Sequence, residues 1–212
     1  MKINIRIIAL LVFLFGGCST EPSQESPAEI VPLTIGNTWI YQSKMYDSSD
    51  AMIDQWIDTT RIIGDSTING EKWFWFNWNF YVSSSTYLIK NTPTGYCQFD
   101  RNLLINAPVL NYKYPAKSGD VYNVIFQFKD SIWSFQRTVV TVDTEVIVPS
   151  ASYSCLLYYN PRVPLTSATE VTEQEYFIAT GTGIVKENRF RTSFSGRRYL
   201  WSATELTKAI LK

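Results

Sequence analysis

Hydrophobic and polar residues alternate along most of the chain beyond residue 30, which is the pattern of β-strands that bury one face. The alternation is clearest in residues 73–82. One face of this run is apolar and consists of Phe74, Phe76, Trp78, Phe80 and Val82. The opposite face is aromatic but also polar and consists of Trp73, Trp75, Asn77, Asn79 and Tyr81. The run is therefore predicted to be a strand with two different faces.

Similar runs predict strands along the rest of the chain. They lie at 38–41, 55–63, 87–90, 95–99, 121–129, 133–148, 154–159, 175–179, 184–187 and 198–203. Asn69-Gly70 favours a tight hairpin turn before residues 73–82. The proline-containing stretches 103–115 and 160–168 predict loops. In the long run 133–148, the valines Val140, Val142, Val146 and Val148 are expected to share a face, with one break in the strand.

These strands predict an all-β fold. No window of ten residues shows the 3.6-residue repeat of an amphipathic helix. About ten to twelve antiparallel strands with short turns are typical of a single antiparallel β domain. We place this domain at residues 31–212, and a curved sheet, a sandwich and an open barrel all fit the pattern.

The first residues have the features of an export signal. The first six residues carry two positive charges, from Lys2 and Arg6, and the apolar run 7–15 follows them. As a helix this run would span about 14 Å, well short of the ~30 Å hydrocarbon core of a bilayer, so residues 1–17 are read as a signal peptide. Gly16-Gly17-Cys18 resembles the lipobox of bacterial lipoproteins. The resemblance implies that the Cys18 thiol is acylated and that the mature chain begins there.

The residues after Cys18 predict a tether. Residues 19–29 contain no large apolar side chain, so they cannot bury surface to offset their ordering entropy. We therefore assign residues 18–30 to the lipidated cysteine and a flexible tether. Ser19, which stands where inner-membrane lipoproteins have aspartate, favours the outer membrane by the same resemblance.

Three segments resemble small lipoproteins of the Bacteroidetes type whose function is unknown. Residues 32–41 look like their P-L-x-x-G-N-x-W-x-Y opening, residues 68–73 like their I-N-G hairpin, and residues 181–186 like their late G-x-G segment. The resemblance implies a β-rich envelope protein. The resemblance does not imply any catalytic residue in this chain.

The composition excludes several classes of function. The chain has 19 basic and 19 acidic residues, and removal of Lys2 and Arg6 with the signal leaves 17 basic ones, so no positive surface for nucleic acid is expected. Histidine is absent, which excludes histidine triads and histidine metal sites. Gly181-Thr182-Gly183 lacks the further residues of a phosphate loop. We predict a non-enzymatic binding or structural protein without cofactor or metal.

The two-faced run suggests a ligand. If the face with Trp73, Trp75, Asn77, Asn79 and Tyr81 is exposed, it forms a stacking platform suited to a glycan. If the sheet curls, the rings line an apolar cavity suited to an acyl chain, as in a periplasmic lipid or lipoprotein carrier. In a third alternative, both faces are buried in a two-layer core.

Two further cysteines, Cys97 and Cys155, can be read in two ways. In an oxidising envelope they can form a disulfide, which in the chain-entropy model would contribute about 4 kcal/mol to stability. Alternatively, they are two buried thiols that do not meet.

Overall fold

The computed structural model describes residues 29–80, 83–99, 108–128, 131–164, 171–193 and 195–212. These residues form strands and turns. The strands are β1 (Thr38–Tyr46), β2 (Met52–Ile68), β3 (Glu71–Phe80), β4 (Ser83–Thr92), β5 (Gly95–Phe99), β6 (Val109–Lys113), β7 (Val121–Phe128), β8 (Ser131–Val148), β9 (Ala151–Pro164), β10 (Val171–Ala179), β11 (Gly183–Thr192) and β12 (Arg198–Ile210). No helix in this described part of the chain could cross a membrane.

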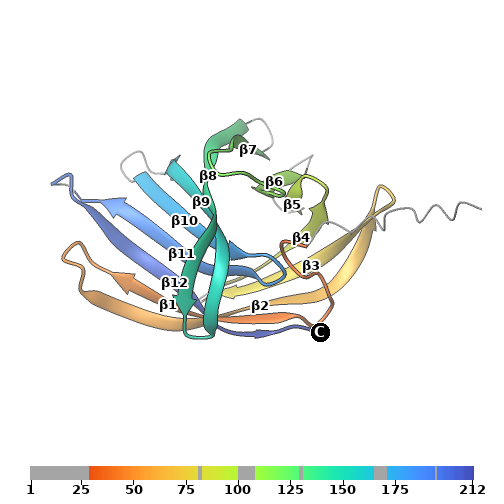
Figure 1. The fold of residues 1–212 in the computed structure, drawn as a ribbon, viewed down its shortest axis with the longest axis horizontal. Coiled ribbons are helices and arrows are strands. Elements are labelled where there is room, and N and C mark those ends of the chain that lie inside the picture. Colours follow the sequence, from red (N-terminus) through yellow and green to blue (C-terminus); the bar gives the residue numbers. More distant parts are fainter. Residues whose placement is uncertain (1–28, 81–82, 100–107, 129–130, 165–170, 194) are drawn as a thin grey trace, which may run out of the picture.

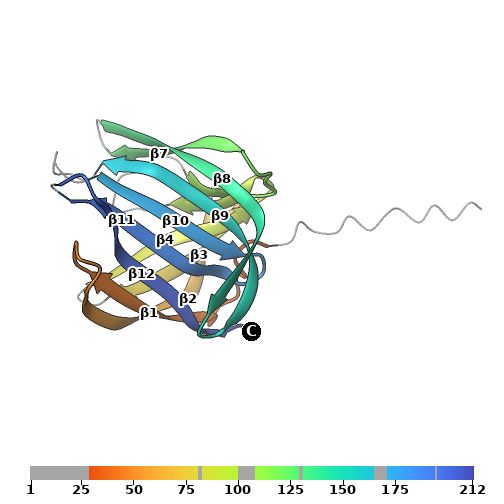
Figure 2. The same ribbon diagram turned by 60° about the vertical axis from the view of Figure 1, so that its left-hand side comes forward.

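The twelve strands belong to one antiparallel sheet. Its order is β6-β5-β4-β3-β2-β1-β12-β11-β10-β9-β8-β7, so strands consecutive in sequence are paired except β6 and β7, which are the two edge strands, and β1 pairs with β12. The sheet curls until β6 approaches β7, which makes a nearly closed barrel (Figures 1 and 2). The prediction of one antiparallel all-β fold is confirmed, and the open barrel is the alternative that the chain adopts.

The barrel has a seam between β6 and β7 that side chains close. The backbone ladder of the described residues ends at β6 on one side and at β7 on the other. The Tyr122 hydroxyl donates to the Asn111 carbonyl at 2.8 Å and accepts from the Lys113 amide at 3.2 Å. The Tyr158 hydroxyl donates to the Lys113 carbonyl at 2.7 Å. Val109 of β6 also packs with Val124 of β7, so apolar contact contributes to the closure of the seam.

Residues 29–33, which we call the plug, close one end of the barrel. The Glu29 carbonyl accepts from the Gly181 amide at 2.8 Å, and the Val31 carbonyl accepts from the Asn91 side chain at 2.7 Å. Ile30 and Val31 are buried in the main core cluster. The first described residues of the chain therefore belong to the core of the barrel.

Two predicted loops contain strand residues. The stretch 103–115 includes β6, so the prediction of a loop is wrong there, because Pro108 and Pro115 flank the strand instead of interrupting it. In the stretch 160–168, β9 continues to Pro164. A register shift against β10 accommodates the proline at 161, since a bulge does not require every backbone N–H to pair.

The four valines of β8 lie on different faces. Val140 and Val142 are exposed, whereas Val146 and Val148 are buried in the main core. Two register shifts between Val139 and Thr144 add residues to β8 relative to β9 and reverse the alternation. The expectation of a shared face is therefore wrong, although the strand is irregular within the predicted run.

Candidate ligand-binding cavity

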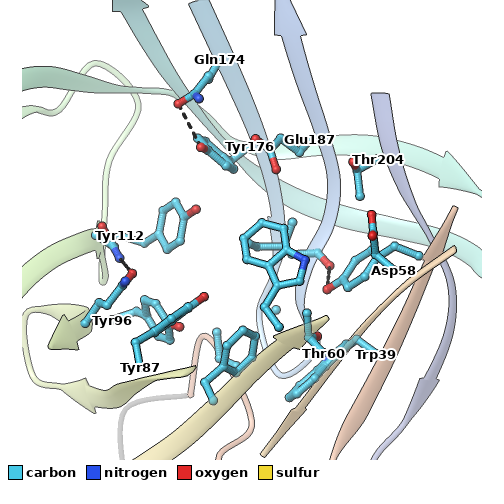
Figure 3. Close-up of a pocket in the computed structure, with 18 of the residues that line it drawn as sticks. Trp39, Asp58, Thr60, Tyr87, Tyr96, Tyr112, Gln174, Tyr176, Glu187 and Thr204 are labelled. Carbon is cyan, nitrogen blue, oxygen red and sulfur yellow. Dashed lines mark hydrogen bonds between the residues drawn. The ribbon is translucent and has the colours of Figure 1, made fainter. Parts of the chain in front are cut away.

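The barrel contains a partly open cavity of about 330 Å³. Strands from nearly the whole circumference contribute to its wall, because every second residue of each strand points inward. Aromatic side chains form the largest group in the lining, ten of its 22 residues, and Figure 3 shows part of this wall. The aromatic side chains are Trp39, Tyr41, Phe76, Trp78, Tyr87, Tyr96, Tyr112, Phe126, Phe135 and Tyr176.

Contacts between rings hold this lining in place. Tyr112 of β6 lies at the centre of one group, with ring centroids 5.8 Å from Tyr96, 5.2 Å from Tyr158 and 5.6 Å from Tyr176. The contacts to Tyr158 and Tyr176 are edge-to-face, the arrangement that the ring quadrupoles favour. These rings come from both sides of the seam, so they also help to close the barrel.

Trp39 and Tyr41 of β1 have their polar atoms satisfied by the backbone. The Trp39 indole N–H donates to the Thr182 carbonyl at 2.6 Å, and the Tyr41 hydroxyl donates to the Ile184 carbonyl at 3.0 Å. Because both donors are used within the wall, the two side chains contribute ring surface to the cavity.

Burial keeps the cavity tyrosines neutral. Loss of hydration raises the pKa of Tyr41, Tyr96, Tyr112 and Tyr176 far above the usual value, since the interior disfavours a phenolate. The hydroxyls therefore stay protonated, and able to donate hydrogen bonds, even in alkaline solution.

Asp58 supplies a carboxylate on the wall formed by β1, β2 and β12. It is 1% exposed and accepts hydrogen bonds from the Ser43 hydroxyl at 2.5 Å and the Trp56 indole at 3.0 Å. Ser43 also lies 2.9 Å from the Thr204 hydroxyl. Hydrogen bonds of this kind offset much of the cost of burying a charge.

Glu187 and Arg189 of β11 form an ion pair in the lining. The Arg189 Nε lies 2.5 Å from the Glu187 carboxylate, and this carboxylate raises the pKa of the guanidinium above its usual range. The two charges neutralise each other, so the pair adds polarity to the wall but no net charge.

Arg137 of β8 is the fourth charged side chain on the lining and is 4% exposed. Its Nε donates to the Asn160 Oδ1 at 2.7 Å, and its Nη1 donates to the Asn111 carbonyl. The guanidinium also lies over rings, with centroids at 4.8 Å for Tyr112 and 5.2 Å for Tyr176. Among the residues that the structure describes, no carboxylate forms an ion pair with it.

The sequence-derived ligand residues that the structure describes, Trp73, Trp75, Asn77 and Asn79, lie on the outer face of β3, opposite the cavity. Trp73 is 2% exposed and packs with Leu88, and the Lys90 ammonium lies 4.6 Å from its ring centroid. Trp75 packs against the same cluster. The inner face of β3 contributes Phe76 and Trp78 to the cavity instead.

The two predicted asparagines do not join Trp73 in a common binding surface. The Asn77 amide donates to the Thr86 hydroxyl at 3.0 Å, and Asn79 is exposed. Tyr81 and the lipidation residue Cys18 lie outside the described residues. No group of three Cys, Asp or Glu side chains within the described ranges could hold a metal.

Cys97 and Cys155 are both free thiols in the structure. Cys97 packs with Trp73 in the outer cluster, and Cys155 lies in the main core, so the fold does not join them. Burial raises the pKa of Cys155 to about 11 and also raises the pKa of Cys97, which makes both thiols poor nucleophiles.

We expect the chain from residue 19 to show two thiols when it is unfolded without reductant, and almost no fast-reacting thiol when it is folded. The reason is that the reactive species is the thiolate, which burial disfavours. Titration with an aromatic disulfide reagent measures both numbers. Absence of thiols in the unfolded, unreduced chain would show instead that a disulfide forms.

Sequence reasoning missed Arg137, although a signal was present. Phe135, Arg137 and Val139 occupy alternate positions, so a cation stands between two residues of an otherwise apolar face. Charged residues are rarely buried without a partner, so a charge in such a position indicates a satisfied interior site.

The strands and the cavity together define the class: a nearly closed barrel made from one antiparallel sheet, with an aromatic interior. No family model matches the sequence, and no curated protein matches it.

Two solved structures have a similar fold. A candidate exported protein of Bacteroides fragilis with a YmcC-like fold superposes with a TM-score of 0.59 at 12% identity, covering 86% of this chain and 99% of its own. A candidate lipoprotein of Parabacteroides distasonis superposes with a TM-score of 0.50 at 11% identity, covering 88% of this chain and 100% of its own. At these identities the likeness establishes the fold.

Proposed function

We propose that this protein is a lipid-anchored protein of the bacterial envelope that binds one small amphiphilic molecule inside its barrel. The cavity is the observation that carries the proposal, because a concave site that combines aromatic surface with polar side chains is typical of ligand sites. The signal-like residues 1–17, Cys18 and the exported or lipoprotein descriptions of the structural neighbours support the envelope location.

The size of the cavity indicates the size of the ligand. A volume of about 330 Å³ lies at the lower end of the ~300–1,000 Å³ range of small-molecule sites. One short acyl chain or one aromatic compound fits this space. The several acyl chains of a lipoprotein do not, so the cavity favours a small-ligand binder over a lipoprotein carrier.

The outer face of β3 offers less support for a glycan site. A sugar ring stacks on an open aromatic face. The ring of Trp73 is almost fully buried, with Lys90 placed over it and Phe99 at 6.0 Å. We therefore place the ligand in the interior.

Native mass spectrometry of the chain from residue 19, exported behind a cleavable signal and recovered gently, tests the proposal. All described residues are retained in this chain, since the described part begins at residue 29. We expect a stoichiometric extra mass in the range of a small amphiphile. A clean protein mass, with no binding of added amphiphiles, would contradict the proposal.

A matched pair of variants locates the ligand. Thr60 lines the cavity, and the neighbouring Thr59 points to the other side of the same strand. Thr60→Phe fills part of the cavity and should remove most of the extra mass, whereas Thr59→Phe should retain it. Equal loading of both variants would place the ligand elsewhere.

A further inference from the structure

We infer that the ligand of this cavity carries an anionic oxygen group of the carboxylate type, and that Arg137 binds this group. The inference rests on the proposed function and adds the chemistry of the ligand. Arg137 is buried, its hydrogen-bond partners are neutral, and the other charges on the lining have partners of their own.

Burial makes an unneutralised guanidinium costly. A charged group taken out of water is stabilised in proteins by an opposite charge or by a full set of hydrogen bonds. Arg137 is 4% exposed and lies on the cavity lining. An anion that entered the cavity would supply the opposite charge at a place where water screens it little.

The partners of Arg137 are neutral and rigidly placed. The Asn160 Oδ1 faces Arg137 because the Asn160 Nδ2 donates to Gln174 at 2.9 Å. The Tyr176 hydroxyl donates to the same Gln174 oxygen at 2.9 Å (Figure 3). This network fixes the position of the Asn160 side chain, which in turn accepts the hydrogen bond from Arg137. The guanidinium is thus positioned before any ligand arrives, which reduces the entropic cost of binding.

The geometry of arginine suits a carboxylate. A guanidinium has five N–H groups in a planar fork; Arg137 uses two of them for Asn160 and Asn111, and the Tyr122 hydroxyl is a further hydrogen-bonding neighbour. Two parallel N–H donors can bind both oxygens of a carboxylate. The rings of Tyr112, Tyr176 and Phe135 surround the guanidinium and offer apolar surface to the rest of the ligand.

The other charges on the lining do not neutralise Arg137. Glu187 is paired with Arg189. Asp58 is bound by Ser43 and Trp56 on the far wall, where Figure 3 places it with Thr204 and opposite Tyr112 and Gln174. Among the described residues, Arg137 is therefore the lining cation without an ion-pair partner; it lies beside the seam, with aromatic surface between the two walls.

Calorimetric titration of the chain from residue 19 with octanoate, 1-octanol and octyltrimethylammonium tests the inference. The three probes share one alkyl chain and differ in the charge of the head. We expect octanoate to bind about tenfold more tightly than 1-octanol, equivalent to about 1.4 kcal/mol, and the cationic probe to bind most weakly. A purely structural Arg137 would not produce this order.

Variants assign the preference to one residue. Arg137→Gln should bring the ratio of the octanoate and 1-octanol affinities close to one, and Arg137→Lys should keep part of it. Arg197→Gln, at an exposed arginine of the β11–β12 hairpin, should keep the full ratio. If Arg137→Gln does not fold, the comparison of probes on the unchanged chain and on Arg137→Lys decides.

Each other outcome has a distinct meaning. Equal binding of octanoate and 1-octanol to the unchanged chain overturns the anionic ligand and leaves the proposed function intact. A full preference that survives in Arg137→Gln also overturns the role of Arg137. Failure of all three probes to bind overturns both the inference and the small-amphiphile proposal.

Discussion

Replacing Gly95 with alanine should destabilise the barrel by at least ~3 kcal/mol, the largest effect that we expect from one added methyl group. Gly95 has a φ of +138°, where residues with a side chain are strained. A Cβ there would lie 2.0 Å from the Tyr112 carbonyl oxygen and 2.7 Å from the Tyr114 nitrogen. Both are backbone atoms, which cannot rotate away.

The clash would occur next to the seam between β6 and β7, where the barrel closes. Gly95 pairs with Lys113 at the start of the β5–β6 ladder, and Lys113 accepts and donates hydrogen bonds across the seam. A shift of β6 would therefore disturb both neighbours of that strand.

Gly70→Ala is the matched control for Gly95→Ala. Gly70 also has a positive φ, of +79°, but no atom lies within 4 Å of a Cβ built on it. Only the conformational strain remains, and this costs about 1–2 kcal/mol. Urea unfolding followed by tryptophan fluorescence compares the two variants. Equal losses in both would show that the contacts of Gly95 are not the cause.

Replacing Trp39 with alanine should cost about 4 kcal/mol, because removal of a large buried aromatic side chain leaves a cavity. Trp39 is almost fully buried in the main core cluster, next to the plug and Phe76. It also donates the hydrogen bond to Thr182 that ties β1 to the β10–β11 hairpin. For a chain of this size the melting temperature should fall by about 8–16 °C.

Trp39→Phe separates packing from hydrogen bonding. Phenylalanine retains most of the apolar contact but lacks the indole N–H, so the expected loss is closer to ~1 kcal/mol. Thermal unfolding followed by circular dichroism gives both values. A melting temperature for Trp39→Ala within about 2 °C of the unchanged chain would contradict the role that we give to this residue.

Much of the fold could be predicted because alternation is a local property of the chain. Asn69-Gly70 predicted a hairpin, and both residues have the positive φ values that a tight turn between strands requires. The strand β6 was missed because its neighbouring prolines suggest a loop, while its stability comes from Tyr112 packing against residues far along the chain. The β8 bulge is likewise decided by pairing with β9.

The cavity was less predictable, because alternation separates two faces without showing which one points inward. The two faces of residues 73–82 were identified from sequence, and the curvature of the sheet then placed Phe76 and Trp78 inside and Trp73 outside. Which rings leave space between them depends on packing across the barrel. This packing depends on all the strands together, so no single segment of the sequence predicts it.

The plug also determines where mechanical load would enter the molecule. In the lipid-anchored protein that we propose, tension from the anchor would reach the described part of the chain at Glu29 and Val31, before any strand of the sheet. Val31 forms part of the cavity wall, so the first hydrogen bonds to be strained are those that hold this wall in place. Pulling on such an anchor would thus act on the wall of the proposed ligand site before it acted on the twelve-stranded ladder.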